Sequence, residues 1–134
     1  MKPVIALDVD GVLLPFRGDF ELNPEHGVWL RELSDTCELV WATSWGYQAN
    51  TELSPDLGLP DLPVVSKDQV PLYGAPRPLV WVDDMFHGQA MPDLADRVHA
   101  TGRRALFVGT DPHVGLDKRD MNAIRFYVGL DWLP

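Results

Sequence analysis

Residues 4–11 read VIALDVDG, an apolar run that ends abruptly in two aspartates and a glycine. Residues 4–7 predict a buried β-strand, because they are apolar throughout and lie between a proline and an aspartate. Asp8 and Asp10 then follow with one residue between them. Two carboxylates this close repel each other, and Asn, Gly or Pro would end a strand equally well. The pair therefore indicates a chemical role at the end of this strand.

Four further short apolar runs predict strands along the rest of the chain. They lie within residues 37–43, 62–66, 77–84 and 103–110. Helical segments are expected within residues 24–35, 46–53, 91–102 and 118–133. Because strands alternate with helices and the strand runs are apolar throughout, we predict an α/β fold with a parallel sheet covered on both faces. The expected architecture is a three-layer sandwich with a five-stranded, Rossmann-like sheet, formed by residues 1–134 as a single domain.

Several residues mark where the helices should begin or end. Asn23 precedes a proline and predicts the N-cap of the first helix. Pro55 is expected to end the second helix, because the residue before a proline disfavours helical backbone. Gly102 stands where a C-cap belongs. Asp117 is expected to cap the closing helix, over residues 118–133.

Composition limits the binding partners and the cellular compartment to be expected of the protein. The formal net charge of −9 disfavours non-specific binding to nucleic acid or to anionic membranes, which basic patches attract. No apolar segment approaches the roughly 20 residues of a membrane-spanning helix, and the run before Asp8 is too short for a signal peptide. Cys37 is the only cysteine, which excludes an internal disulfide and favours a reducing compartment. We expect a cytoplasmic protein with no membrane partner.

Reactive side chains gather where the expected strands end. From the first strand to the fourth they are Asp8 with Asp10, Thr43 with Ser44, Lys67, and Asp83 with Asp84. A single pair of aspartates occurs often by chance, so the joint placement carries the signal. In open α/β sheets, ligands bind beyond the carboxyl ends of the strands. We therefore expect these side chains to form one site.

This set of groups suits Mg²⁺ and a phosphoryl group. Magnesium takes one or two carboxylates, and its charge relieves the repulsion within an acidic cluster. Either Thr43 or Ser44 can donate a hydrogen bond to a phosphate oxygen, and Lys67 can balance the charge of a phosphoryl group in transfer. An aspartate can attack phosphorus and form an aspartyl-phosphate. A second aspartate two residues away can protonate the leaving oxygen and later deprotonate water.

Together these motifs resemble those of the haloacid dehalogenase (HAD) superfamily. The stretch DVDGVLLP is similar to its first motif, LVWATSW to its second, Lys67 to its third and LVWVDD to its fourth, in the family's order from Val4 to Asp84. The closing segment, residues 110–133, resembles that of small HAD proteins, some of which are associated with RNA repair. The presence of Asp10 favours phosphate esters, because the resemblance implies that dehalogenases lack this second aspartate.

The resemblance also implies a role for each matched residue. Asp8 would be the nucleophile and a magnesium ligand, and Asp10 the general acid and base, with its backbone carbonyl on the metal. Thr43 would bind the phosphoryl oxygen, with Ser44 as the alternative, and Lys67 would steady the nucleophile and phosphate, with Arg77 as a poorer substitute. The metal ligands would be completed by Asp83 and Asp84. Gly11 and Trp45 are expected at the substrate, where the indole could stack on a base or sugar.

The spacing of the motifs leaves no room for an inserted cap domain. Only residues 11–42 separate the first two motifs, enough for a flap over residues 13–20 and one helix. The site should therefore be open, and the resemblance implies that capless members act on macromolecules or polymer ends. A phosphorylated substrate is expected, with a nucleic-acid end or a nucleotide among the candidates. Phosphoproteins and small molecules are also candidate substrates.

Two other functions compete with a phosphatase. Signalling receiver domains also combine aspartates, a Thr or Ser and a Lys on a five-stranded parallel sheet, but their acidic pair comes first and their lysine last. Here Lys67 precedes Asp83 and Asp84, which argues against a receiver. A non-catalytic interaction module would not need an intact set of motifs. His87 and His113, which lack metal-ligand spacing, are expected to be ordinary loop residues.

Overall fold

The structure is a computed structural model that describes residues 1–16, 21–88 and 92–134. Its elements alternate between strands and helices, as the sequence predicts. In chain order they are β1 (Val4–Leu7), α1 (Pro24–Ser34), β2 (Glu38–Trp41), α2 (Gln48–Glu52), α3 (Ser54–Leu57), the 3₁₀ turn η1 (Lys67–Gln69), β3 (Leu79–Val82), the 3₁₀ turn η2 (Asp84–Phe86), α4 (Pro92–Ala100), β4 (Ala105–Val108) and α5 (Lys118–Tyr127).

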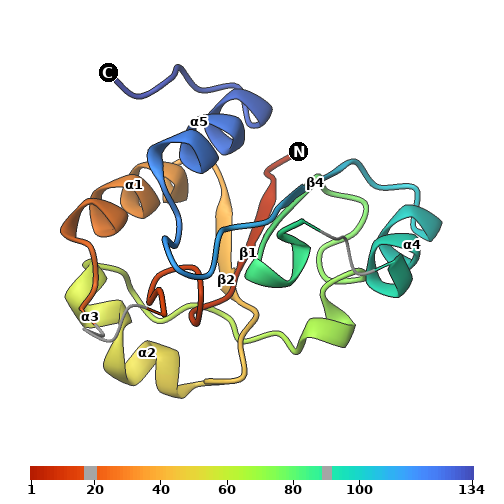
Figure 1. The fold of residues 1–134 in the computed structure, drawn as a ribbon. Helices are drawn as coiled ribbons and strands as arrows, with labels where there is room; N and C mark the ends of the chain where they lie inside the picture. Colours follow the sequence, from red (N-terminus) through yellow and green to blue (C-terminus); the bar gives the residue numbers. More distant parts are fainter. Residues whose placement is uncertain (17–20, 89–91) are drawn as a thin grey trace.

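The strands form one parallel sheet in the order β2-β1-β3-β4 (Figure 1). The strands are paired without a stagger: Leu7 lies beside both Trp41 and Val82, and Val82 lies beside Val108. Because the last residues of all four strands pair with one another, the strands end at one level. Whatever follows them in the sequence is delivered to the same edge.

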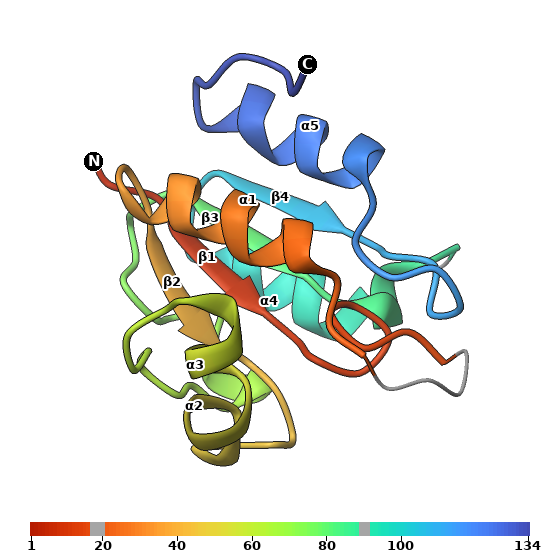
Figure 2. The same ribbon diagram turned by 90° about the vertical axis from the view of Figure 1, so that its left-hand side faces the viewer.

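Each strand is apolar throughout because both faces of the sheet are covered. Alternate side chains point to opposite faces, so that Ile5 belongs to one core and Ala6 to the other. The first core is closed by α1 and α5, and the second receives Val98 of α4. Figure 2 shows α1 in front of the sheet and α4 behind it. Trp41 and Trp81 are fully buried, one in each core. The three-layer α/β prediction is confirmed.

The prediction of five strands is wrong, because residues 62–66 form no strand. They contribute a single bridge, in which Val64 lies beside Trp41 on the outer side of β2. Trp41 N donates to Pro63 O at 2.9 Å, and Val65 N donates to Trp41 O at 2.8 Å. Pro63 itself has no N–H to extend the ladder, and η1 begins directly afterwards. The sheet of the described residues therefore has four strands.

Most of the predicted helix ends are confirmed. Asn23 Oδ1 accepts from Glu25 N at 2.9 Å, and Asp117 Oδ1 accepts from Asp120 N at 2.9 Å, both at helix starts. Gly102, with φ of +75°, follows α4 closely. The first residue of the expected fourth helix, Met91, lies outside the described residues.

The second helix ends before Pro55, as expected: α2 ends at Glu52, and Pro55 lies in the first turn of α3, where its missing N–H costs no hydrogen bond. One prediction about a helix end is wrong. The closing helix α5 ends at Tyr127 rather than near residue 133. Gly129, with φ of +88°, turns the chain away, and Leu130 N donates back to Arg125 O at 2.7 Å.

The long connection between β2 and β3 is fastened by a buried arginine. Arg103, just before β4, is 4% exposed. Its guanidinium donates to Arg77 O at 2.8 Å, Tyr73 O at 2.8 Å and Pro71 O at 3.1 Å. These carbonyls belong to a segment without regular helix or strand. The hydrogen bonds from Arg103 therefore stabilise a segment that has no helix or strand hydrogen bonds of its own. Among the described residues, no helix combines the length and apolar character needed to cross a bilayer.

Candidate functional site

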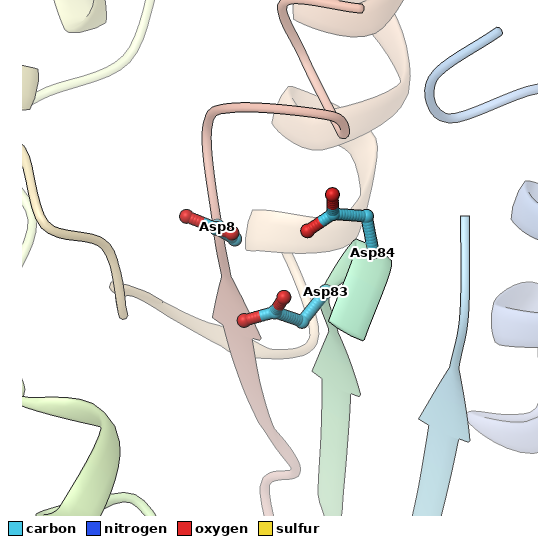
Figure 3. Close-up of side chains that lie close together, drawn as sticks. All are labelled: Asp8, Asp83 and Asp84. Atoms are coloured by element: carbon cyan, nitrogen blue, oxygen red, sulfur yellow. The ribbon is translucent and has the colours of Figure 1, made fainter. Parts of the chain in front are cut away.

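Three aspartates converge at the carboxyl edge of the sheet. Asp8 follows β1, Asp83 follows β3, and Asp84 opens η2. Each offers one carboxylate oxygen, and these oxygens all lie within 4.8 Å of one another. Figure 3 shows the three side chains turned toward a common point between the two strand ends. The predicted convergence of carboxylates from separate segments is therefore present.

The backbone of the sheet fixes two of these aspartates. Asp8 N donates to Val82 O at 3.0 Å, and Asp83 N donates to Val108 O at 3.1 Å, so the strand ladder continues through both residues. Asp8 Oδ1 also accepts from Val9 N at 2.8 Å, and Asp83 Oδ1 from Met85 N at 3.0 Å. Each side chain thus commits one oxygen to the local backbone. Its Oδ2 atom is left for other partners.

Lys67 faces these two Oδ2 atoms. Its Nζ lies 3.2 Å from Asp8 Oδ2 and 2.8 Å from Asp83 Oδ2. The lysine stands at the start of η1, a single turn, so no long helix is needed to present it. Arg77, the alternative considered from the sequence, pairs instead with Glu38 Oε1 at 2.6 Å, at the opposite edge of the sheet. The structure therefore brings Lys67 to the acidic cluster and leaves Arg77 outside it.

Burial makes the cluster electrostatically strained. Desolvation and, second, the charge of Asp83 raise the pKa of Asp8 to about 6. Burial also raises the pKa of Asp83. Burial works against the charged form of Lys67, but its contacts with Asp83 and Asp8 outweigh this and raise the pKa of the ammonium. The cluster holds three carboxylates and one ammonium, which pairs with two of them, so a second positive charge would be stabilising.

A divalent cation fits this cluster by charge and by donor type. Asp83 Oδ2 is buried and, beyond its ion pair with Lys67, has no hydrogen-bond partner among the described residues. A carboxylate oxygen can accept from more than one partner, so this atom can also bind a metal ion. Carboxylate oxygens are hard ligands of the kind that Mg²⁺, Ca²⁺ and Mn²⁺ prefer. The residues present therefore suit a hard metal ion.

Asp10 lies near the cluster but makes a different contact. Its Oδ2 accepts a hydrogen bond from Trp45 Nε1 at 3.2 Å, and its side chain is not one of the three clustered carboxylates. Thr43 is 8% exposed, and its Oγ1 accepts from Trp45 N at 3.3 Å. Ser44 is exposed. Thr43 Oγ1, held by the backbone, keeps its proton free to donate, which favours Thr43 over Ser44 as the ordered hydroxyl.

Gly11 and Thr110 complete the edge, and the second of them was not foreseen. Gly11 has φ of +79°, and a Cβ at this position would lie 2.5 Å from Asp84 Oδ2. Thr110 Oγ1 is fully buried and donates to Gly11 O at 2.7 Å, across 99 residues of sequence. The residue ends the apolar run at 103–110, so the strand-end argument applied to that run would have found it.

The clustered aspartates do not line the hollow beside α1 and α3. A hollow of about 580 Å³ lies beside the start of α1 and beside α3, and its walls include Leu14, Asn23 and Leu57 but none of the clustered aspartates. Of the flap expected over residues 13–20, residues 17–20 lie outside the described part of the chain. Leu13 and Leu14 pack in the core instead of projecting over the site.

Comparisons with protein-family models, with curated proteins and with solved structures each gave no significant match.

Proposed function

We propose that this protein is a magnesium-dependent phosphomonoester hydrolase of the HAD type, which works through an aspartyl-phosphate on Asp8. The observation that carries the proposal is the meeting of Asp8, Asp83, Asp84 and Lys67 at one edge of the sheet. Three carboxylates and one ammonium are an unfavourable group to assemble unless a cation and an anion complete it. A metal ion and a phosphoryl group are a cation and an anion of the required kinds.

Each side chain has a part in the proposed reaction. The Asp8 carboxylate attacks phosphorus while Lys67 balances the charge of the phosphoryl oxygens. The Thr43 hydroxyl donates a hydrogen bond to one of these oxygens. Asp10 gives its proton to the leaving oxygen and later takes one from the attacking water. Magnesium, held by Asp8, Asp83 and Asp84 with the Asp10 carbonyl, would supply positive charge near the transferring group.

The order of segments across the sheet supports this proposal over a receiver domain. In receiver-like sheets the order is 2-1-3-4-5, with the third strand beside the first. Here the short segment around Val64 lies beside β2, on the outside of the sheet. Counting that segment as third gives the order 3-2-1-4-5, the other common arrangement of doubly wound sheets. The intact set of polar groups likewise gives little support to a non-catalytic module.

The short spacing of the motifs, which leaves no room for a cap domain, favours a large substrate or the end of a polymer. A nucleic-acid end or a nucleotide is one candidate, in keeping with the resemblance to HAD proteins associated with RNA repair. The net charge of −9 opposes a long polyanion and favours substrates that present one phosphate. A panel containing a 3′-phosphorylated oligonucleotide, nucleotides and phosphopeptides would rank these classes by kcat/KM.

The direct test is release of phosphate from p-nitrophenyl phosphate in the presence of Mg²⁺. We expect Asp8→Asn to abolish turnover and Asp10→Asn to lower it by roughly 10²- to 10⁴-fold, because the attacking water loses its general base. The exposed Asp35, at the end of α1, provides the matched control Asp35→Asn, which should behave as wild type. Stoichiometric phosphorylation without turnover would favour a receiver. Absence of both phosphate chemistry and Mg²⁺ binding would favour a non-catalytic module.

A further inference from the structure

Trp45 contacts two of the residues that the proposed reaction uses. Its indole Nε1 donates to Asp10 Oδ2 at 3.2 Å, and its backbone N donates to Thr43 Oγ1 at 3.3 Å. The tryptophan comes from the turn after β2, whereas Asp10 comes from the loop after β1, 35 residues earlier. A single residue therefore ties the proposed acid and the proposed phosphate-binding hydroxyl to each other.

The indole is well suited to hold a carboxylate in one orientation. Its ring is partly buried and packs against the core beneath α1 and α5, which limits its rotation. The indole N–H is a donor only, so it must meet an acceptor oxygen and cannot exchange roles with Asp10. With Oδ2 occupied by this bond, the other oxygen, Oδ1, is free to carry the proton.

We propose that Trp45 is a positioning residue, which holds Asp10 so that its Oδ1 faces the leaving group. This inference rests on the proposed phosphatase function. In the first step an Asp8 oxygen forms a bond to phosphorus, the bond from phosphorus to the ester oxygen breaks, and the proton on Asp10 Oδ1 passes to that oxygen as the alcohol leaves. In the second step water attacks phosphorus, its proton returns to Asp10, and the bond to Asp8 breaks as phosphate is released.

A positioning defect should depend on the leaving group. An alkoxide is a poor leaving group and needs the proton from Asp10, whereas p-nitrophenolate leaves with little help. The ratio kcat/KM covers the steps up to loss of the leaving group, so it includes the acid step and excludes the later attack of water. A purely structural loss would lower kcat/KM for both kinds of ester by the same factor.

The experiment compares Trp45→Phe with wild type on p-nitrophenyl phosphate and on an alkyl phosphate, glycerol 2-phosphate. Phenylalanine keeps an aromatic ring against the core and the backbone bond to Thr43, and it removes the indole N–H together with part of the ring. We expect kcat/KM for the alkyl ester to fall at least 10-fold further than that for the aryl ester. Trp132→Phe is the matched control, because Trp132 is 68% exposed on the C-terminal segment, and it should leave both values unchanged.

A second measurement does not depend on activity. In protein labelled with ¹⁵N at its five tryptophans, Trp45→Phe assigns the Trp45 indole signal by its loss. Asp10→Ala should then shift that signal and speed its hydrogen exchange, with the other four indole signals in place. An unmoved Trp45 signal would overturn the inference, because the bond to Asp10 would be missing in solution.

The kinetic outcomes separate this inference from the proposed function. Equal losses on the two esters, or no loss on either, in an active wild-type background would overturn the positioning role and leave the phosphatase proposal in place. A wild-type protein that hydrolyses neither ester would overturn both, whatever the indole signal does.

Discussion

Lys67 Nζ lies 2.8 Å from Asp83 Oδ2, and this contact joins the irregular segment after β2 to the end of β3. The carboxylate is completely buried, while the lysine side chain is about one third exposed. The ammonium therefore reaches inward from the surface to an acid that water does not reach. Its removal would leave Asp83 and Asp8 facing each other without a cation.

We expect Lys67→Met to destabilise the metal-free protein at pH 7 by about 1–3 kcal/mol, less than for a fully buried pair because the lysine is partly solvated. Phosphate-ester turnover should fall at least 10²-fold in the same variant, because the charge of the phosphoryl group would lose its partner. Urea unfolding and steady-state kinetics measure the two effects. Lys2→Met, at an exposed position, is the matched control. Wild-type stability and turnover in Lys67→Met would contradict the role given to this ion pair.

Stability without metal should fall as the pH rises from about 4 to about 6. Asp8 has a pKa raised from 3.8 to about 6 in the folded protein, so the folded state binds more protons than the unfolded state within that interval. The resulting stability is complete below pH 3.8 and is lost as the pH rises through about 6. A shift of this size corresponds to roughly 2–3 kcal/mol.

The measurement for this prediction is the free energy of unfolding against pH, with EDTA and with millimolar Mg²⁺. Asp120, beside Asp117, also has a pKa raised to about 6 by burial, so the series is best made in an Asp120→Asn background. Magnesium should remove most of the fall, because it stabilises the ionised cluster. If the free energy of unfolding in EDTA rose from pH 4 to pH 6, the raised pKa of Asp8 in the folded protein would be contradicted.

Gly11→Ala should weaken metal binding more than it weakens the fold. The new Cβ would meet Asp84 Oδ2 at 2.5 Å, so the carboxylate must move. Gly102→Ala is a close control, since Gly102 has φ of +75° against +79° for Gly11 and its Cβ would meet nothing within 4 Å. Both variants should lose stability through backbone strain, by about 1–2 kcal/mol. Titration calorimetry should show at least 10-fold weaker Mg²⁺ binding for Gly11→Ala alone.

Thr110→Val should destabilise the protein by about 1–3 kcal/mol, because it leaves the buried Gly11 carbonyl without its donor. Thr110→Ser retains the hydroxyl and removes only a methyl group, so its loss of stability should be smaller. Thermal unfolding of the pair isolates the hydrogen bond. If valine proved as stable as serine, the contact from Thr110 to Gly11 would not support the loop that carries Asp10.

The sequence allowed the sheet and the clustering of the aspartates to be predicted, because both follow from periodicity. Apolar runs of parallel strands end at a shared edge, so Asp8 and Asp83 could be placed together without coordinates. The prediction of a strand over residues 62–66 was wrong, because it counted the apolar residues without considering that Pro63 has no N–H to donate. The end of α5 was placed too late because Gly129 was not weighed as a helix stop.

Contacts between particular side chains lay beyond the sequence. Nothing in its spacing indicates that the indole of Trp45 turns toward Asp10, because the two residues belong to separate loops whose approach depends on packing. Lys67 was expected at the site, but the single turn that presents it could not be read from the proline-rich segment around it. Strand ends are thus more predictable than the loops that follow them.

Arg103 lies before the first residue of β4, whereas the clustered aspartates follow the last residues of β1 and β3. The segment that Arg103 binds, residues 71–77, nevertheless begins only a few residues after Lys67. The effect of a substitution on this protein should therefore not depend simply on its distance from the reacting atoms. A lysine in place of Arg103 would keep the charge but lose the planar fork that reaches several carbonyls at once. Surveys of variants ranked by proximity alone would overlook this remote anchor.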